Sequence, residues 1–302
     1  MPSSALFRLF GRSQNIDPEG PSIDDLLNKA ESRVLHRPSE REHDIDFIFI
    51  HDSVPDLDHV WKSDDSDKLW PTHVFEHFPT LARIIIYEYR RNWVESLAEI
   101  VDPHHLRTLS EELLVALGQD EYKSGVPLVV FAHGFGGLLY EQAVVLSEDT
   151  GDIFKQRTHT AFLFGTPHMG AGIAEWAIMT AKSHGIPCAK TAQAQDWSLL
   201  KDKIAVTATM QKRFREILER HSSRPGLSGC FSTKREPASS LILAPEWAVL
   251  PEFKPIAVDH EHSSMTMLAP EDKASKDIVE TLESVVKQLV PDSAEDRQPV
   301  TD

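Results

Sequence analysis

Cysteine is scarce in this chain, whose 302 residues include only Cys188 and Cys230. Two cysteines so far apart make neither a disulfide framework nor the CxxC pair of a zinc finger. This scarcity favours a reducing compartment, and we expect a cytoplasmic protein. The stretch from Met1 to Asn15 contains two arginines and no acidic residue. It is weakly similar to a mitochondrial presequence, so a mitochondrial location is the alternative.

Positive charge and long apolar runs are also lacking. Lys and Arg total 31 against 47 Asp and Glu, which gives a formal net charge of -16 at pH 7. Affinity for nucleic acid depends largely on Lys and Arg contacts to phosphate, so we expect no nucleic-acid partner. No run approaches the roughly 20 consecutive apolar residues that span a bilayer. The composition therefore predicts a soluble or peripheral protein without a transmembrane segment.

The chain contains an alternation of strand-like and helix-like segments between two irregular ends. We expect residues 1–28 to be disordered, residues 29–290 to form one domain, and the acidic segment 291–302 to be a disordered tail. Strands covered on both faces are nearly continuous in hydrophobicity. Segments of this kind run from Asp46 to His51, Arg83 to Tyr87, Leu128 to Phe131, Thr160 to Phe164 and Leu241 to Leu243.

The segments between these strands have helical spacing of their apolar residues. Helices are predicted from Leu106 to Leu117, Gly136 to Leu146, Ile204 to Leu218 and Ile278 to Leu289. The alternation predicts an α/β protein with a mostly parallel central sheet and helices on both faces. The less regular segment from Ala171 to Lys201 is expected to form a small, irregular cap over the carboxyl edge of that sheet.

The most informative motif follows the strand that begins at Leu128. The sequence Phe131-Ala-His-Gly-Phe-Gly-Gly-Leu-Leu139 predicts a strand end, a tight turn and a helix start. This is the context of a nucleophile elbow, in which G-x-S-x-G presents a serine hydroxyl above the sheet. Here the central residue is Gly134. Glycine tolerates a positive φ without steric cost, so the turn is preserved while the attacking oxygen is lost.

Four motifs in order resemble the serine-esterase and lipase-like α/β-hydrolases. They are Ile50-His-Asp-Ser53 followed by Val60-Trp61, Ala132-His-Gly-Phe-Gly-Gly-Leu138, Phe164-Gly-Thr-Pro-His168, and His262-Ser-Ser-Met265. Within that family the chain is similar to relatives of the mitochondrial serine-active-site-containing protein and to the N-terminal domains of fungal NACHT multidomain proteins. The resemblance implies an α/β-hydrolase fold from about residue 33 to about residue 289.

The resemblance also implies roles for particular residues. His262 matches the general base, and His260 is the fallback. Glu246 lies where the family has the acid that orients this histidine, and Asp259 is the second choice. The order of elbow, acid and histidine agrees with that of α/β-hydrolases.

An oxyanion hole is expected from the backbone N–H of Phe135 and from the loop after His51. The family has glycines in that loop, whereas this chain has Asp52 and Ser53. Asp52 brings a carboxylate close to where negative charge would develop. Two catalytic loops therefore depart from the family pattern.

No cofactor and no metal centre are expected. His260 and His262 are two residues apart, so in an extended segment they share a face and could bind a metal with Asp259 or Glu261, but no further ligands stand at metal-site spacing. His51 and His133 lie at strand ends and are interpreted as structural residues rather than bases.

Three functions remain open from the sequence. The first is a hydrolytically impaired pseudohydrolase that binds a lipid, an acyl or ester-like small molecule, or a protein. The second is an active hydrolase or a non-hydrolytic acid-base enzyme that uses His262, for example in fungal small-molecule biosynthesis. The third is an interaction domain whose acidic surface attracts basic partners.

Overall fold

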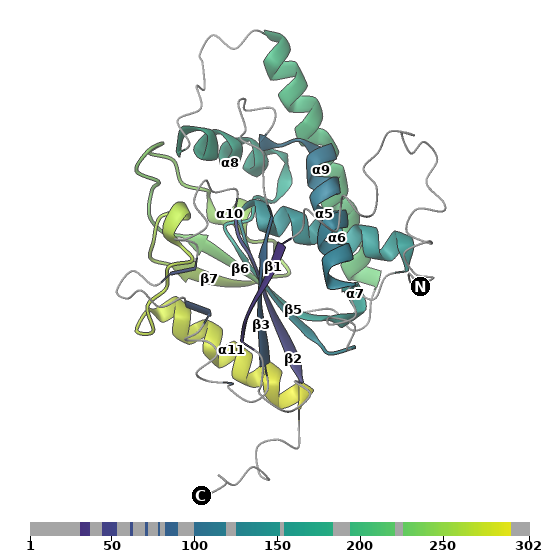
Figure 1. Ribbon diagram of the computed structural model, residues 1–302. Coiled ribbons are helices and arrows are strands. Elements are labelled where there is room, and N and C mark those ends of the chain that lie inside the picture. Colours follow the sequence, from purple (N-terminus) through teal and green to yellow (C-terminus); the bar gives the residue numbers. More distant parts are fainter. Residues whose placement is uncertain are drawn as a thin grey trace, which may run out of the picture.

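A computed structural model gives the fold of the chain (Figure 1). It describes residues 31–36, 44–52, 61–62, 70–71, 78, 82–89, 100–118, 125–151, 154–183, 194–220 and 226–290, with backbone alone at 31–36, 169–171 and 194–197. The two ends expected to be disordered, 1–28 and 291–302, lie outside these residues.

One sheet of seven strands organises the molecule, in the order β1-β3-β2-β4-β5-β6-β7. The edge strand β1 is antiparallel to β3, and every other neighbouring pair is parallel. The strands are β1 (Glu31–His36), β2 (Ile45–Ile50), β3 (Ala82–Glu88), β4 (Leu128–His133), β5 (Thr158–Phe164), β6 (Gly226–Ser232) and β7 (Lys254–Val258). The expected mostly parallel sheet is confirmed.

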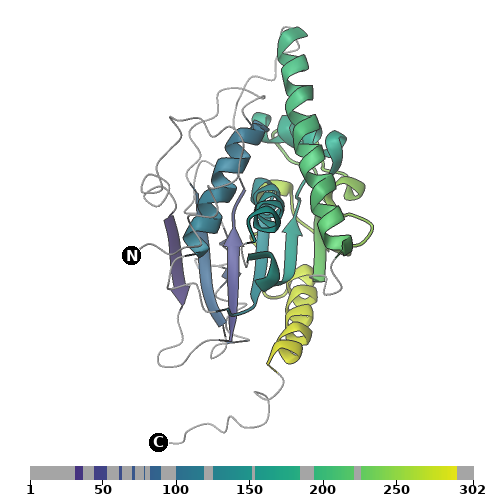
Figure 2. The ribbon, with the colours of Figure 1, turned by 90° about the vertical axis from the view of Figure 1, so that its right-hand side faces the viewer.

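Helices cover both faces of this sheet. The helices are α5 (Pro103–Leu117), α6 (Phe135–Thr150), α7 (Phe154–Arg157), α8 (Met169–Ser183), α9 (Ala194–Arg220), α10 (Pro245–Ala248) and α11 (Lys273–Leu289). In Figure 2 the long helix α9 extends past the carboxyl ends of the strands. The segment expected to form an irregular cap contains α8 and the start of α9, so much of it is regular helix.

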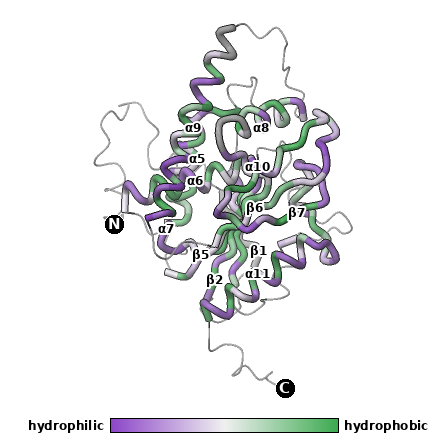
Figure 3. Tube along the Cα trace, turned by 180° about the vertical axis from the view of Figure 1, so that it is seen from behind, coloured by the Kyte–Doolittle hydropathy of each residue, from purple (hydrophilic) through white to green (hydrophobic). Residues whose placement is uncertain are grey.

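Alternate residues of the central strands enter two different cores. On the face covered by α5, α6 and α9, the strands contribute mainly aliphatic side chains such as Ile48 and Val130. On the face covered by α11, they contribute mainly aromatic ones, and Phe49 stacks on Phe131 with ring centroids 4.4 Å apart. The hydropathy colouring of Figure 3 shows apolar residues along these central strands. This two-sided burial explains why the strands are hydrophobic almost without interruption.

A buried ionic group ties the amino ends of three strands together. Asp46, at the start of β2, accepts hydrogen bonds from the Nε of Arg83 at 2.7 Å and from its Nη2 at 2.8 Å. Arg157, just before β5, donates to the same carboxylate at 2.9 Å. All three side chains are buried. The two guanidinium groups on one carboxylate fix the relative positions of the amino ends of these strands. This ionic group lies at the edge of the sheet opposite the elbow.

One expected strand is wrong and three strands were missed, namely β1, β6 and β7. Leu241 to Leu243 lies in a loop, with only Leu243 buried. The strands that complete the sheet are β6 and β7. Their sequences, GLSGCFS and KPIAV, contain Gly, Ser, Lys and Pro, so they lack the continuous apolar signal of the central strands. Among the described residues, no helix is both long and apolar enough to cross a bilayer.

Candidate active site

Gly134 forms the tip of the turn between β4 and α6. Its φ of 49° lies in the left-handed region that side chains disfavour, and its N–H donates to the carbonyl of Phe164 at 2.8 Å. Two residues further on, a Cβ at Gly136 would lie 2.5 Å from the carbonyl oxygen of His51. Glycine at 136 is therefore required for the close approach of α6 to the end of β2. The expected strand, tight turn and helix are all present.

The turn stands where the chain changes direction across the sheet. From β2 the chain goes to β3 on one side, and the next strand, β4, pairs with β2 on the other. In parallel sheets, ligands bind at such a switch point, outside the carboxyl ends of the strands. Asp52 follows β2 and Gly134 follows β4, so the topology places both residues there.

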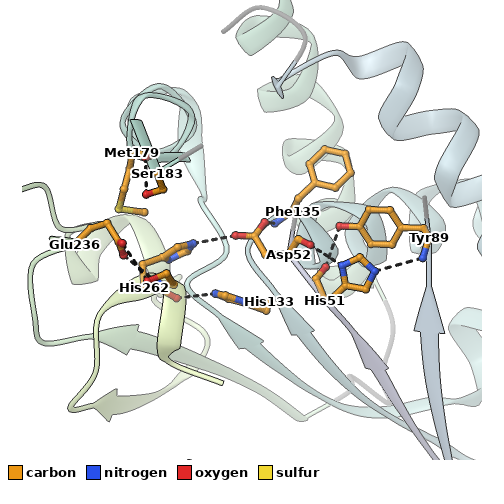
Figure 4. A network of polar contacts seen from close by, with 10 residues as sticks. His51, Asp52, Tyr89, His133, Phe135, Met179, Ser183, Glu236 and His262 are labelled. Atoms are coloured by element: carbon orange, nitrogen blue, oxygen red, sulfur yellow. Dashed lines mark hydrogen bonds and ion pairs between the residues drawn. The ribbon is translucent and has the colours of Figure 1, made fainter. Parts of the chain in front are cut away.

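Asp52 fills the space beside the turn. Its Oδ1 accepts the backbone N–H of Phe135 at 2.7 Å, and its Oδ2 lies 3.1 Å from the Nε2 of His262 (Figure 4). The side chain of Asp52 is 6% exposed. A Cβ built on Gly134 would overlap this carboxylate. Asp52 therefore occupies the Phe135 N–H that was expected to bind an oxyanion. It also contacts the His262 nitrogen that was expected to face a nucleophile.

His262 opens a short 3₁₀ helix, His262–Ser264, just after β7. Its ring is buried, and its Nδ1 has no hydrogen-bond partner among the described residues. That nitrogen faces Gly165, where a Cβ would lie 2.5 Å away. His262, the expected base, lies beside the elbow with a carboxylate on Nε2 instead of on Nδ1.

The acids predicted to orient His262 lie elsewhere. Glu246 is exposed on α10, and no hydrogen bond or ion pair joins it to His262 in the described part of the chain. Asp259 is exposed and accepts from Thr233 Oγ1 at 2.9 Å. His260, the fallback base, lies 3.4 Å from a carboxylate oxygen of Asp272. The structure thus does not bring the predicted acids to the imidazole. Ser53 lies outside the described residues.

Glu236 is a buried acid that the sequence analysis missed. It follows β6, and its two carboxylate oxygens accept from the backbone N–H of Ser263 at 3.1 Å and from the Ser263 hydroxyl at 3.0 Å. It therefore holds the loop that carries His262 without touching the imidazole (Figure 4). In this fold the acid is sought after a late strand. Glu236 was missed because β6, the strand before it, was not recognised in the sequence.

Two further histidines lie beside the site in different roles. The Nε2 of His133 is 2.9 Å from the backbone carbonyl of His262, and the two rings are 4.8 Å apart. His51 stacks on Tyr89 at 4.2 Å, and its Nδ1 is 2.5 Å from the carbonyl of Asp52. His51 supports the backbone of the loop, whereas His133 lies against His262 itself.

The buried setting shifts the titration of these groups. Burial lowers the pKa of His51 and of His133 to about 4, because their charged forms lose hydration. Burial alone would raise the pKa of Asp52, but the bond to His262, the charges of His133 and His262, and the Phe135 N–H outweigh it. The pKa of Asp52 consequently lies well below its usual value, and its carboxylate is charged at neutral pH.

The arrangement can therefore hold a proton or bind a cation. Asp52, His133 and His262 are the described residues that together offer potential metal-ligand atoms, all within 4.8 Å of one another. Gly134 supplies no atom for nucleophilic attack.

The sheet order, the turn after β4 and the histidine after β7 together decide the fold. The chain has the α/β-hydrolase fold. The elbow precedes the histidine in the chain, and the turn that carries Gly134 lies at the carboxyl edge of the sheet as that fold requires. The expected fold class is confirmed.

Comparisons with known proteins find likeness only among solved structures. No family model and no curated protein matches its sequence. Solved structures that resemble it include acetyl xylan esterase 1 from Thermoanaerobacterium sp. JW/SL YS485, at 10% identity and a TM-score of 0.48 over 86% of this chain and 79% of that one. An α/β hydrolase superfamily protein from Enterococcus faecalis has 14% identity and a TM-score of 0.47 over 86% and 96%. The lipase BlEst2 from Bacillus licheniformis has 15% identity and a TM-score of 0.46 over 85% and 97%.

Proposed function

We propose that this chain is a pseudohydrolase: a serine-esterase-like α/β-hydrolase domain that binds a lipid, acyl or protein ligand and hydrolyses esters poorly or not at all. The observation that carries this proposal is the relation between Gly134 and Asp52. The turn keeps the backbone shape of an elbow but carries no oxygen, and a carboxylate fills the adjoining space.

The oxyanion site supports the same conclusion. Ester hydrolysis places negative charge on the substrate oxygen, which an oxyanion hole stabilises through backbone N–H groups. In this chain the Phe135 N–H already donates to Asp52 at 2.7 Å. A second negative charge brought to that position would be repelled by the carboxylate. The turn therefore offers no oxygen to attack the ester, and the site disfavours the oxyanion that attack would form.

His262 also lacks the support that a general base needs. In a catalytic triad, the acid bonded to Nδ1 fixes the tautomer and stabilises the imidazolium that forms. Nδ1 of His262 has no such partner among the described residues. Triads stripped of one member retain roughly 10³- to 10⁴-fold acceleration over water through binding and the oxyanion hole. With the Phe135 N–H occupied, we expect even less.

The narrower relationship to the mitochondrial serine-active-site-containing protein and to NACHT-associated domains belongs to this proposal, and it rests on the four sequence motifs. A cytoplasmic location is likewise part of the proposal, and it is supported by the low cysteine content.

The test is activity-based labelling together with turnover. The full chain is treated with a fluorophosphonate probe and, separately, with p-nitrophenyl esters of acetate and palmitate, beside a known serine esterase. We expect no labelling, and a hydrolysis rate that is unchanged in the variant His262→Ala. Labelling comparable to the reference esterase, or turnover that collapses in His262→Ala, would overturn the proposal.

A further inference from the structure

Three side chains of types that can ligate a metal converge at the carboxyl edge of the sheet. They are Asp52 after β2, His133 at the end of β4, and His262 after β7. One potential ligand atom from each lies within 4.8 Å of the others. All three residues are at most 5% exposed. Burial removes the hydration of all three side chains, and ligation of a cation would replace it.

We propose that Asp52, His133 and His262 bind one divalent transition-metal ion, with Zn²⁺ the ion that suits them best. Two imidazoles and one carboxylate form a ligand set that Zn²⁺ takes in proteins, with the fourth position left to water or a ligand. Mg²⁺ and Ca²⁺ prefer oxygen ligands alone, so this set discriminates against them. The inference goes beyond the proposed function and does not depend on it.

The distances require only a small adjustment. Ligand atoms on a tetrahedral zinc stand about 3.3 Å apart, as follows from bonds of about 2.0 to 2.1 Å. Asp52 Oδ2 and His262 Nε2 are already 3.1 Å apart. The ring of His133 must approach this pair by an amount on the order of 1 Å. An ion between the pair replaces their hydrogen bond, and any proton held there is released to solvent.

Outer contacts already hold two of the ligands in orientation. The Phe135 N–H binds Asp52 Oδ1, which leaves Oδ2 directed toward His262. The carbonyl of His262 can only accept, so the Nε2 of His133 carries the proton in their 2.9 Å bond. The other ring nitrogen of His133 then has a free electron pair. Metal-ligating histidines characteristically donate their second N–H to such a carbonyl.

This site carries no local pattern in the sequence because its ligands lie far apart in the chain. Metal ligands were expected only among the neighbours of His260 and His262, so no metal centre was predicted. His260 is bonded instead to Asp272 and takes no part in the cluster.

The experiment titrates the tag-free full chain, first stripped of metal with a chelator, with Zn²⁺ by calorimetry. We expect one equivalent to bind and the thermal unfolding temperature to rise, whereas Mg²⁺ should have neither effect. The variant His133→Asn should weaken zinc binding at least about tenfold. Losing a residue that only hydrogen-bonds to a metal ligand already costs about that much, so losing a ligand should cost no less. The variant His260→Ala, in the same loop as His262, is the matched control and should keep the native affinity.

Co²⁺ provides a second readout that needs no variant. Its visible absorption strengthens when protein ligands hold it in four-coordination, so the native chain should develop such a spectrum at one equivalent, and Zn²⁺ should abolish it. Failure of the native chain to bind one Zn²⁺, or full affinity in folded His133→Asn, would overturn the inference. Neither result touches the esterase assays, so failure here is distinguishable from failure of the proposed function.

Discussion

The carboxylate of Asp52 lies in the space into which any side chain at position 134 would project. The two positions are coupled: an acid on the loop after β2 is compatible with glycine at the elbow and incompatible with serine there. Glycine at position 134 and the acid at position 52 therefore depend on each other, although they lie far apart in the sequence.

Restoring serine alone should fail for this reason. We expect Gly134→Ser to lower the free energy of unfolding by about 1 to 3 kcal/mol, the usual cost of overpacking, and to leave fluorophosphonate labelling absent. The double variant Asp52→Gly/Gly134→Ser removes the overlap and frees the Phe135 N–H. It should gain labelling, although slowly because no acid among the described residues is bonded to Nδ1 of His262. Strong labelling of the single variant would contradict the coupling.

Asp52 itself should stabilise the native chain. Replacing it with alanine leaves the buried Phe135 N–H without its acceptor, which costs about 1 to 3 kcal/mol. Asp52→Asn retains a carbonyl oxygen of similar shape and should cost less. Urea denaturation of both variants at pH 7 measures the difference. An alanine variant as stable as the native chain would show that water or a neighbouring group replaces the carboxylate at no cost.

Acid should weaken the fold in a defined window. The pKa of His51 and of His133 falls from the ordinary 6.5 to about 4 on folding. Between these values the unfolded chain binds more protons than the folded chain, so the free energy of unfolding is full above pH 6.5 and declines as the pH falls toward 4. The pKa of Asp52 is also depressed, and its contribution is lost at lower pH still.

Urea denaturation at several pH values between 7 and 4.5 measures this slope. The variant His51→Asn should make it shallower, because one of the two buried imidazoles is gone. A free energy of unfolding that stays constant across the window would refute the assignment.

The buried ionic group at the other edge of the sheet gives the largest predicted loss. Asp46→Ala leaves two guanidinium groups buried without their carboxylate, and breaking a buried pair in this way costs about 3 to 5 kcal/mol. The control is Lys273→Ala, which removes an ion pair to Asp277 on the surface of α11, where the lysine side chain is 86% exposed. That change should stay within about 0.5 kcal/mol. Similar losses in both variants would contradict the role given to Asp46.

The sequence predicted the parts of the fold that carry strong local signals. Strands β2, β4 and β5 are buried on both faces, so their hydrophobicity alone identified them. Strands β6 and β7 were missed because glycine, serine and proline interrupt them. Leu241 to Leu243 has the apolar character of a strand but pairs with no neighbour in the sheet.

The site could be predicted only where a motif fixed it. Gly134 and His262 were located by motifs, and both lie beside Asp52, whose carboxylate adjoins Gly134 and whose Oδ2 is 3.1 Å from the Nε2 of His262. The position of Asp52 itself depends on how the loop after β2 packs against α6, which no local pattern records. Glu236 was missed for a related reason, since the strand that precedes it was not recognised.

The bond between Asp52 and the Phe135 N–H joins two parts of one molecule, so the carboxylate is present there at an effective concentration that dilution does not reduce. For short tethers this concentration is on the order of millimolar. A dissolved acid screened at micromolar concentrations therefore competes at a large disadvantage. Ligands for this site should come from compounds that place a cation beside Asp52, and not from compounds that present another anion.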